Sequence, residues 1–208
     1  MPSVAVFLAP GFEEIEALTV VDYLRRANVD VTVVSVPLDG AESFPIQVTG
    51  SHAVTVVADC TLKEYIERMG GEEPDAIYFP GGMPGAANLA ANQYLFQLAT
   101  KMDRKGRLVA AICAAPAVVL AQTGILASRK WTCYPGMERS LAEFCGGAAR
   151  AEELTENSTH IKDVPFVLDN NVLTGRGPGT AEQFAMKFVE ILTDSKTAAK
   201  IHDGSCQR

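Results

Sequence analysis

The segment RLVAAICAAP, residues 107–116, decides the fold prediction, because an apolar run passes directly into a cysteine followed by small residues. The run RLVAAI (107–112) is typical of a strand inside a parallel sheet. APAVVLAQTGIL (115–126) predicts a helix that starts immediately afterwards. A strand that turns at once into a helix is the repeating unit of α/β proteins.

The same alternation extends outward from this segment in both directions. Strands are predicted at 3–9, 30–36, 75–80, 107–112 and 130–135. Helices are predicted at 13–28, 61–70, 115–126, 137–145, 180–192 and 195–202, with a further helix that follows GGMPGAANL and runs to about Lys105. Asn170–Asn171, inside 165–175, predicts a hairpin turn.

Two predicted helices begin with capping-box spacing, Thr61 with Glu64 and Thr180 with Gln183. With no repeat or linker in the sequence, we expect one α/β domain over 1–208, with a mostly parallel sheet and helices on both faces. Active sites of such sheets lie at the carboxyl ends of the strands. This rule selects the loops 9–13, 80–86 and 113–116.

Composition and charge exclude several classes of function. The net charge of −7 gives no electrostatic reason to bind nucleic acid or an anionic membrane. No signal peptide and no stretch of about 18 apolar residues is present, so we expect a cytosolic (cytoplasmic) protein. The five cysteines are irregularly spaced, without a CxxC pair, and the three histidines lie far apart. We therefore expect free thiols, no metal site and no disulfide framework.

Cys113 stands where a predicted strand ends and a helix begins. A helix N-terminus has a partial positive charge and unpaired N–H groups, which stabilise a thiolate and lower its pKa. The small residue Ala114 beside it allows a sharp turn, as in a nucleophile elbow. The alternative is that Cys113 is only a small core hydrophobe. Position alone leaves both interpretations open.

Two other loops contain groups that could serve such a thiol. Glu16 shares a helix face with Val20 and Leu24, and a buried carboxyl at that position would be protonated and able to donate a hydrogen bond. The alternative is a glutamate at the helix margin, while the first-turn acids Glu13 and Glu14 are explained by the helix dipole. Gly81–Gly82 could present backbone N–H groups as an oxyanion hole, or form a plain tight turn.

Weaker signals come from the last two motifs. Arg176 in GRGPGT (175–180) could hold an anion or pair with an acid, although a structural turn explains it as well. Tyr134, next to Cys133 in WTCYPG, could donate a hydrogen bond or act as a general acid, but such tyrosines more often pack. We treat Cys60, Cys145 and Cys206 as structural or surface thiols.

The chain resembles the ThiJ/PfpI superfamily over residues 3–200, because four of its motifs occur in the order and spacing of that superfamily: APGFEEIEA, PGGMPGA, AAICAAP and GRGPGT. The resemblance is strongest to the branch of the parkinsonism-associated protein deglycase and its bacterial relatives. The resemblance implies a flavodoxin-like (class I glutamine amidotransferase-like) three-layer sandwich, a homodimer and no cofactor. It implies that Cys113 is a nucleophile at a strained elbow and Glu16 its protonated partner. Gly81, Gly82 and Ala114 would supply N–H groups, and Tyr134 and Arg176 would lie in the substrate site.

The implied function is a glyoxalase or deglycase that acts on 2-oxoaldehydes such as methylglyoxal, or on glycated protein or nucleotide groups, in stress protection. The rival is an oxidative-stress sensor or redox-regulated chaperone that uses oxidation of Cys113. A cysteine peptidase ranks lower, because Tyr134 replaces the histidine that many relatives have there. A tyrosine, with a pKa of about 10, is a poor base near neutral pH.

Overall fold

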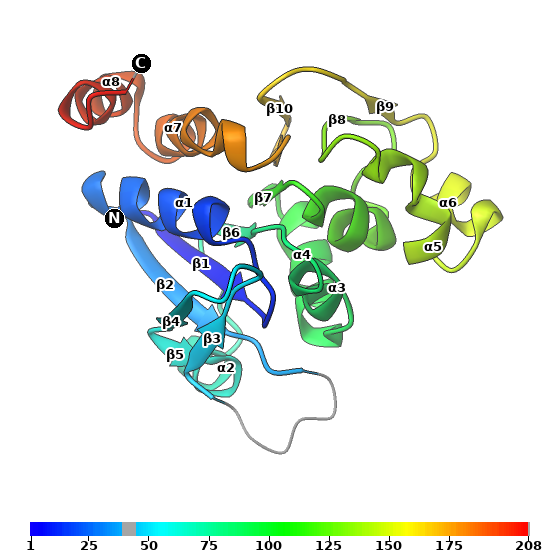
Figure 1. Ribbon diagram of the computed structural model, residues 1–208, viewed down its shortest axis with the longest axis horizontal. Helices are drawn as coiled ribbons and strands as arrows, with labels where there is room; N and C mark the ends of the chain where they lie inside the picture. The colour runs from blue at the N-terminus through cyan, green and yellow to red at the C-terminus, as the bar shows by residue number, and fades with distance from the viewer. Residues whose placement is uncertain (39–44, 208) are drawn as a thin grey trace.

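The computed structural model of the chain has one seven-stranded sheet as its central layer (Figure 1). It describes residues 1–38 and 45–207. The strand order is β10-β11-β7-β6-β1-β2-β5, and every neighbouring pair is parallel except β10 with β11. The strands are β1 (Ser3–Leu8), β2 (Asp30–Ser35), β5 (Cys60–Thr61), β6 (Ala76–Phe79), β7 (Leu108–Ile112), β10 (Phe166–Asp169) and β11 (Val172–Gly175).

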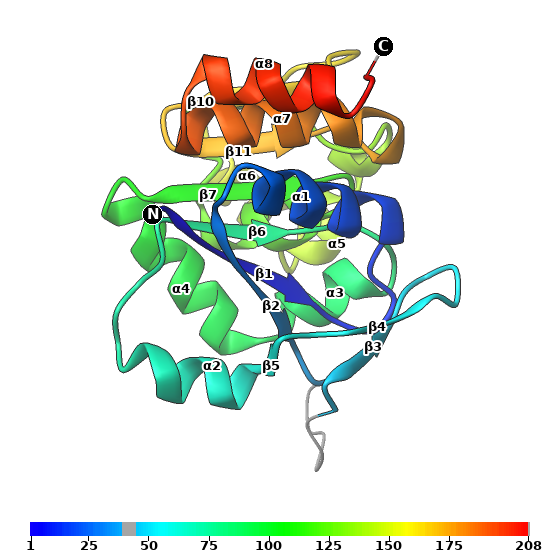
Figure 2. The ribbon, with the colours of Figure 1, turned by 90° about the vertical axis from the view of Figure 1, so that its left-hand side faces the viewer.

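Helices cover both faces of this sheet, which makes the three-layer architecture that the sequence predicts (Figure 2). On one face α1 packs against α7, which packs against α8; α2, α3 and α4 lie on the other face. The helices are α1 (Glu14–Arg26), α2 (Leu62–Met69), α3 (Gly85–Ala90), α4 (Gln93–Arg104), α5 (Leu141–Phe144), α6 (Ala148–Leu154), α7 (Ala181–Leu192) and α8 (Ser195–Gly204).

Burial of the central strands explains their sequences. Every residue of β6 and β7 is buried, because helices cover both sides of a parallel sheet. Continuous apolar runs, rather than alternating ones, are therefore the pattern that this position demands. Within the described ranges, no helix combines the length and the apolar content needed to cross a membrane.

The two predicted capping boxes have different outcomes. At α2 the Thr61 hydroxyl accepts from the Glu64 N–H at 3.3 Å, and the Glu64 carboxylate accepts from the Thr61 N–H at 2.8 Å, so that box is confirmed. At α7 the prediction is wrong. A 3₁₀ turn, Pro178–Thr180, precedes this helix, and the Thr180 hydroxyl bonds to the backbone of Gly177 instead.

Two predicted helices are interrupted. The helix expected to run to about Lys105 is two helices, α3 and α4, because the Asn92 side chain accepts from the Leu95 N–H and starts a new helix. The helix expected at 115–126 is a π-helical turn, Pro116–Leu120, followed by a 3₁₀ turn, and ends at Gly124 in the left-handed conformation. Irregular helical turns of this type often border functional sites.

The segment after residue 128 differs most from prediction. The strand expected at 130–135 is only β8 (Lys130–Trp131), which pairs outside the main sheet with β9 (Thr159–His160). The helix expected at 137–145 is a 3₁₀ turn, Met137–Arg139, followed by α5. The hairpin at Asn170–Asn171 is confirmed by β10 and β11. A second hairpin, β3 (Gln47–Thr49) with β4 (Thr55–Val57), was not predicted.

Candidate active site

Cys113 follows β7 directly, at the carboxyl end of the central strands. Its φ angle is +63°, in the left-handed region that residues other than glycine seldom adopt. Its N–H donates to the Gly175 carbonyl at 2.9 Å, and its carbonyl accepts from the Tyr134 N–H at 2.8 Å. Hydrogen bonds from two other segments therefore hold this sharp turn in place.

Glu16 lies in the first turn of α1 and is completely buried. The helix face that it shares with Val20 and Leu24 is buried too, which excludes the solvent-exposed alternative. One carboxyl oxygen, Oε2, accepts from the Gly81 N–H at 2.8 Å. The other, Oε1, has no hydrogen-bond partner among the residues that the structure describes. Burial raises the pKa of Glu16 to about 8, so the carboxyl keeps its proton at neutral pH.

Cys113 and Glu16 meet at Gly81. A Cβ atom at this glycine would lie 2.6 Å from the Cys113 Cβ, 2.8 Å from the Glu16 Oε2 and 3.0 Å from the Cys113 Sγ. Distances this short leave no room for any side chain. The glycine lets the sulfur and the carboxyl approach each other across the loop after β6.

The sulfur lies among groups with opposing electrostatic effects. Burial raises the pKa of the Cys113 thiol, and the charge of an ionised Glu16 raises it further. The Gly82 and Ala114 N–H groups donate toward the sulfur and act in the other direction. The net shift is upward, opposite to the lowered pKa expected from the helix start alone. Because two negative charges in one buried site repel, the thiolate is favoured only while Glu16 keeps its proton.

The two neighbouring acids have roles that helix-dipole compensation does not explain. The Glu13 side chain caps α1 by accepting from the Glu16 N–H at 2.7 Å, which fixes the turn that holds Glu16. Glu14 is buried and accepts from the His52 N–H at 2.7 Å, so it ties α1 to the loop between β3 and β4. Sequence reasoning missed both contacts. It assigned Glu13 to dipole compensation alone, and it could not pair Glu14 with His52, which lies 38 residues away.

Tyr134 and Arg176 flank the Cys113 turn without their side chains entering the Cys113–Glu16 contact. Tyr134 touches Cys113 through its backbone N–H, while its side chain is half-exposed. The Arg176 guanidinium pairs with Asp163 at 2.9 Å. The structure therefore brings together Cys113, Glu16, Gly81, Gly82 and Ala114, and leaves the substrate-binding roles of the other two as predictions.

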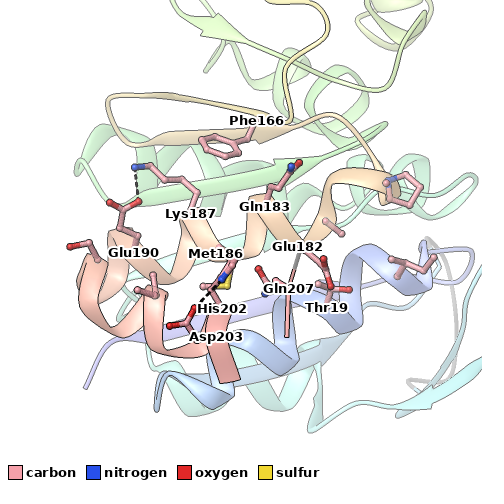
Figure 3. Close-up of a pocket in the computed structure, with 17 residues that line it drawn as sticks. Thr19, Phe166, Glu182, Gln183, Met186, Lys187, Glu190, His202, Asp203 and Gln207 are labelled. Atoms are coloured by element: carbon pink, nitrogen blue, oxygen red, sulfur yellow. Dashed lines mark hydrogen bonds and ion pairs between the residues drawn. The ribbon is translucent and has the colours of Figure 1, made fainter. Parts of the chain in front are cut away.

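A large cavity lies away from these residues (Figure 3). It is an open groove of about 790 Å³ between α7, α8, the start of α1 and β10. Phe166 and Gln183 line it, together with the Lys187–Glu190 and His202–Asp203 pairs. It includes none of the candidate site residues. Size alone therefore does not identify the reactive site, which we place where the sulfur, the buried acid and the N–H groups converge.

The mostly parallel sheet, with a cysteine at a strand-to-helix elbow and a buried glutamate beside it, places the chain in the class of flavodoxin-like α/β proteins. The chain belongs to the DJ-1/PfpI family, whose model matches residues 2–191. Protein dj-1beta of Drosophila melanogaster is 33% identical over 202 residues, which cover 97% of this chain and 95% of that protein. The solved structure of Drosophila DJ-1beta has a TM-score of 0.82 at 31% identity and covers 99% and 97% of the two chains.

Two other relatives have names or descriptions that bear on chemistry. The glutathione-independent glyoxalase DJR-1.2 of Caenorhabditis elegans is 31% identical over 191 residues, which cover 91% of this chain and 88% of that protein. The structure described as Toxoplasma gondii DJ-1, oxidized, has a TM-score of 0.77 at 31% identity, and covers 99% and 98% of the two chains.

Proposed function

We propose that this protein is a cofactor-free glyoxalase that converts 2-oxoaldehydes such as methylglyoxal to 2-hydroxy acids at Cys113. The observation that supports this most is the meeting of a buried sulfur and a buried, protonated carboxyl at Gly81. The name of the C. elegans relative supports the same chemistry. A pKa of about 8 suits Glu16 to both giving and taking a proton near neutral pH.

In the first step the Cys113 thiol releases its proton to solvent, and the thiolate attacks the aldehyde carbon so that a carbon–sulfur bond forms. The aldehyde oxygen takes the proton of Glu16, which gives a neutral hemithioacetal and leaves Glu16 as a carboxylate. The Gly82 and Ala114 N–H groups, which point toward the sulfur, would stabilise the oxygen as charge develops on it.

In the second step the Glu16 carboxylate takes the proton from the former aldehyde carbon and returns it to the adjacent carbon. The hydroxyl proton of the first carbon moves to the neighbouring oxygen, so the adduct becomes a 2-hydroxy thioester. Water then breaks the carbon–sulfur bond and releases the 2-hydroxy acid. The thiol and the protonated Glu16 are restored, and the sum is one 2-oxoaldehyde plus one water to one 2-hydroxy acid.

The same mechanism extends to deglycation, the removal of methylglyoxal adducts from amino groups. In adducts of methylglyoxal on protein or nucleotide amino groups the amine is bonded to the former aldehyde carbon. Cys113 would displace the amine there, so that the carbon–nitrogen bond breaks, the amine leaves with a proton, and the same hemithioacetal forms. The sulfur is only slightly exposed, with the residue 8% accessible. A small free carbonyl therefore reaches it more readily than a group on a folded protein surface, and we expect free 2-oxoaldehydes to be the faster substrates.

The test is methylglyoxal consumption with lactate detection, using wild type beside Cys113→Ser and Glu16→Gln. Both variants should lose at least 100-fold in kcat, because each removes a group that bonds to or moves protons on the substrate. Cys206→Ser, a change at an exposed thiol, is the matched control and should keep full activity. If Cys113→Ser consumed methylglyoxal at the wild-type rate, the proposal would be refuted.

A second candidate is a redox sensor in which peroxide oxidises Cys113 to the sulfinate, one peroxide being consumed for each oxygen added. The oxidised T. gondii structure favours it, as do the N–H groups and the protonated Glu16 around the sulfur. Mass spectrometry after mild peroxide decides between the two. Two oxygens selectively on Cys113, with negligible methylglyoxal turnover, would establish the sensor. The peptidase hypothesis has least support, because His160 lies beside Cys133 instead of Cys113.

A further inference from the structure

A second cluster of ligand-type side chains lies outside the Cys113 site. The Sγ of Cys133, a carboxylate oxygen of Glu138 and a ring nitrogen of His160 all lie within 4.8 Å of one another. The Sγ of Cys133 is 3.7 Å from the Nε2 of His160. The chemistry proposed for Cys113 uses none of the three.

Three separate segments supply these groups, and local contacts hold each one. β8 pairs with β9 in register Trp131 to His160, and the Trp131 and His160 rings pack with centroids 4.9 Å apart. Cys133 follows β8 by two residues and is buried. The Glu138 carboxylate accepts from the Gly136 N–H at 2.7 Å, which holds it within the Met137–Arg139 turn. The cluster is thus assembled by the fold before any ligand arrives.

The spacing suits a small tetrahedral cation. With zinc–sulfur and zinc–nitrogen bonds of about 2.3 and 2.0 Å, tetrahedral geometry places the sulfur and nitrogen about 3.5 Å apart. The observed separation of 3.7 Å requires almost no movement. The Glu138 carboxylate oxygen lies within 4.8 Å of both other ligand atoms, so it can approach a shared ion by rotation of its side chain.

Cys133 and His160 are only weakly bonded to their surroundings. The Cys133 sulfur makes two weak contacts, at 3.4 Å to the carbonyl of Tyr134 and at 3.7 Å to the Nε2 of His160. The Nδ1 of His160 is buried, and no described residue offers it a hydrogen bond. Burial lowers the pKa of His160, which favours the neutral imidazole that a metal ligand requires.

We infer that Cys133, Glu138 and His160 form a binding site for Zn²⁺, with one thiolate, one carboxylate and one imidazole ligand. Binding displaces the thiol proton of Cys133 to solvent, and the two negative ligands balance the charge of the ion. A cavity of about 160 Å³, lined by all three residues, has room for a water as the fourth ligand.

The charges around the cluster are compatible with this assignment. Burial and the Glu138 charge raise the pKa of the Cys133 thiol to about 12, so the sulfur is a thiol until a cation displaces its proton. Arg139, Lys162 and Arg176 also line the cavity. Arg176 is paired with Asp163, and the largely exposed Arg139 lies 3.6 Å, Nε to Oε1, from Glu138, an ion pair that the bound metal would replace. Because the thiolate and carboxylate neutralise the ion, the site adds little positive charge to this surface.

Titration of the metal-free protein with Co²⁺, a coloured substitute for Zn²⁺, tests the site. We expect one equivalent to bind with a thiolate-to-cobalt charge-transfer band, which one equivalent of Zn²⁺ then removes. Cys133→Ser should abolish the band, and His160→Gln and Glu138→Gln should each weaken Zn²⁺ binding at least tenfold. Far-ultraviolet circular dichroism establishes that each variant is folded.

Matched controls separate this site from others. Cys206→Ser changes an exposed thiol, and His52→Gln changes the exposed histidine of a second group of acids, Glu13 and Glu14. Both should bind Co²⁺ as the wild type does. Absence of a charge-transfer band in the wild type would overturn the inference, as would a band that survives Cys133→Ser. A band lost only in Cys113→Ser would place the metal at the candidate active site and equally refute it. The spectroscopic readout is independent of glyoxalase activity.

Discussion

At the scale of single residues, Gly81 is a position where a minimal change should act directly on the candidate site. Gly81→Ala would push a methyl group against both the Cys113 and the Glu16 side chains. We expect at least a tenfold loss of methylglyoxal turnover and a destabilisation of about 1–3 kcal/mol, from the overpacking. Gly179→Ala is the control, because a Cβ atom there meets open space. Equal activity of the two variants would show that the close approach at Gly81 is unimportant.

The buried Glu16 predicts how stability changes with pH. Its pKa is about 8 in the folded protein and near 4.5 when unfolded, so the unfolded chain loses its proton first. The unfolding free energy should therefore fall as the pH rises from about 4.5 to 8, at up to about 1.4 kcal/mol per unit. Urea denaturation across this range, with Glu16→Gln, measures the effect. The amide cannot ionise, so this variant should show a flatter profile, whereas exposed Glu152→Gln should follow the wild type.

At the scale of elements, α2 depends on its N-terminal cap. Thr61→Ala removes the hydroxyl that accepts from the Glu64 N–H, and we expect a loss of about 1 kcal/mol in unfolding free energy. Lys63→Ala, an exposed change in the same helix, should stay within about 0.5 kcal/mol of wild type. Urea denaturation of the three proteins gives the comparison. A Thr61→Ala variant as stable as the wild type would mean that tertiary packing alone holds α2.

At the same scale, α1 links the fold to the candidate site. Its buried face packs on the sheet, its first turn holds Glu16 beside Cys113, and Glu13 and Glu14 anchor that turn. Because α1 belongs to both the core and the candidate site, a shift of this helix would also displace Glu16 from Cys113. Substitutions along its buried face should therefore affect stability and turnover together.

At the scale of the whole molecule, we propose a homodimer, as the family resemblance implies. Ile15 and Leu18 on α1 are 57% and 41% exposed in the single chain, which gives this helix an apolar surface next to the site. Light scattering after size-exclusion chromatography should give twice the 22.2 kDa of the chain. Leu18→Lys should shift the protein toward one chain mass, whereas Phe96→Lys, at an apolar side chain of similar exposure on α4, should not. A wild-type mass of one chain would refute the dimer.

By itself the sequence determined the layer architecture, because apolar runs at 3–9, 75–80 and 107–112 are too short and too continuous for anything but buried parallel strands. It also predicted the loops of the site, since the carboxyl ends of parallel strands share one edge of the sheet. Helical periodicity placed Glu16 on one face with Val20 and Leu24, but only the structure showed that this carboxyl is buried. The thiol pKa was not predicted correctly, because the helix-start argument omits the burial and the neighbouring acid, which only the packed site reveals.

Only the tertiary structure decided the contacts between distant segments. Two such contacts have no local signature in the sequence. One joins Glu14 to His52, and the other brings Cys133 together with Glu138 and His160. The short strand β9, the early end of β8 and the broken helices after residue 84 also escaped prediction, because side-chain caps and packing override propensity over so few residues. Periodicity reports which face of an element is buried, whereas chemistry depends on which side chains meet there, and the fold alone determines that.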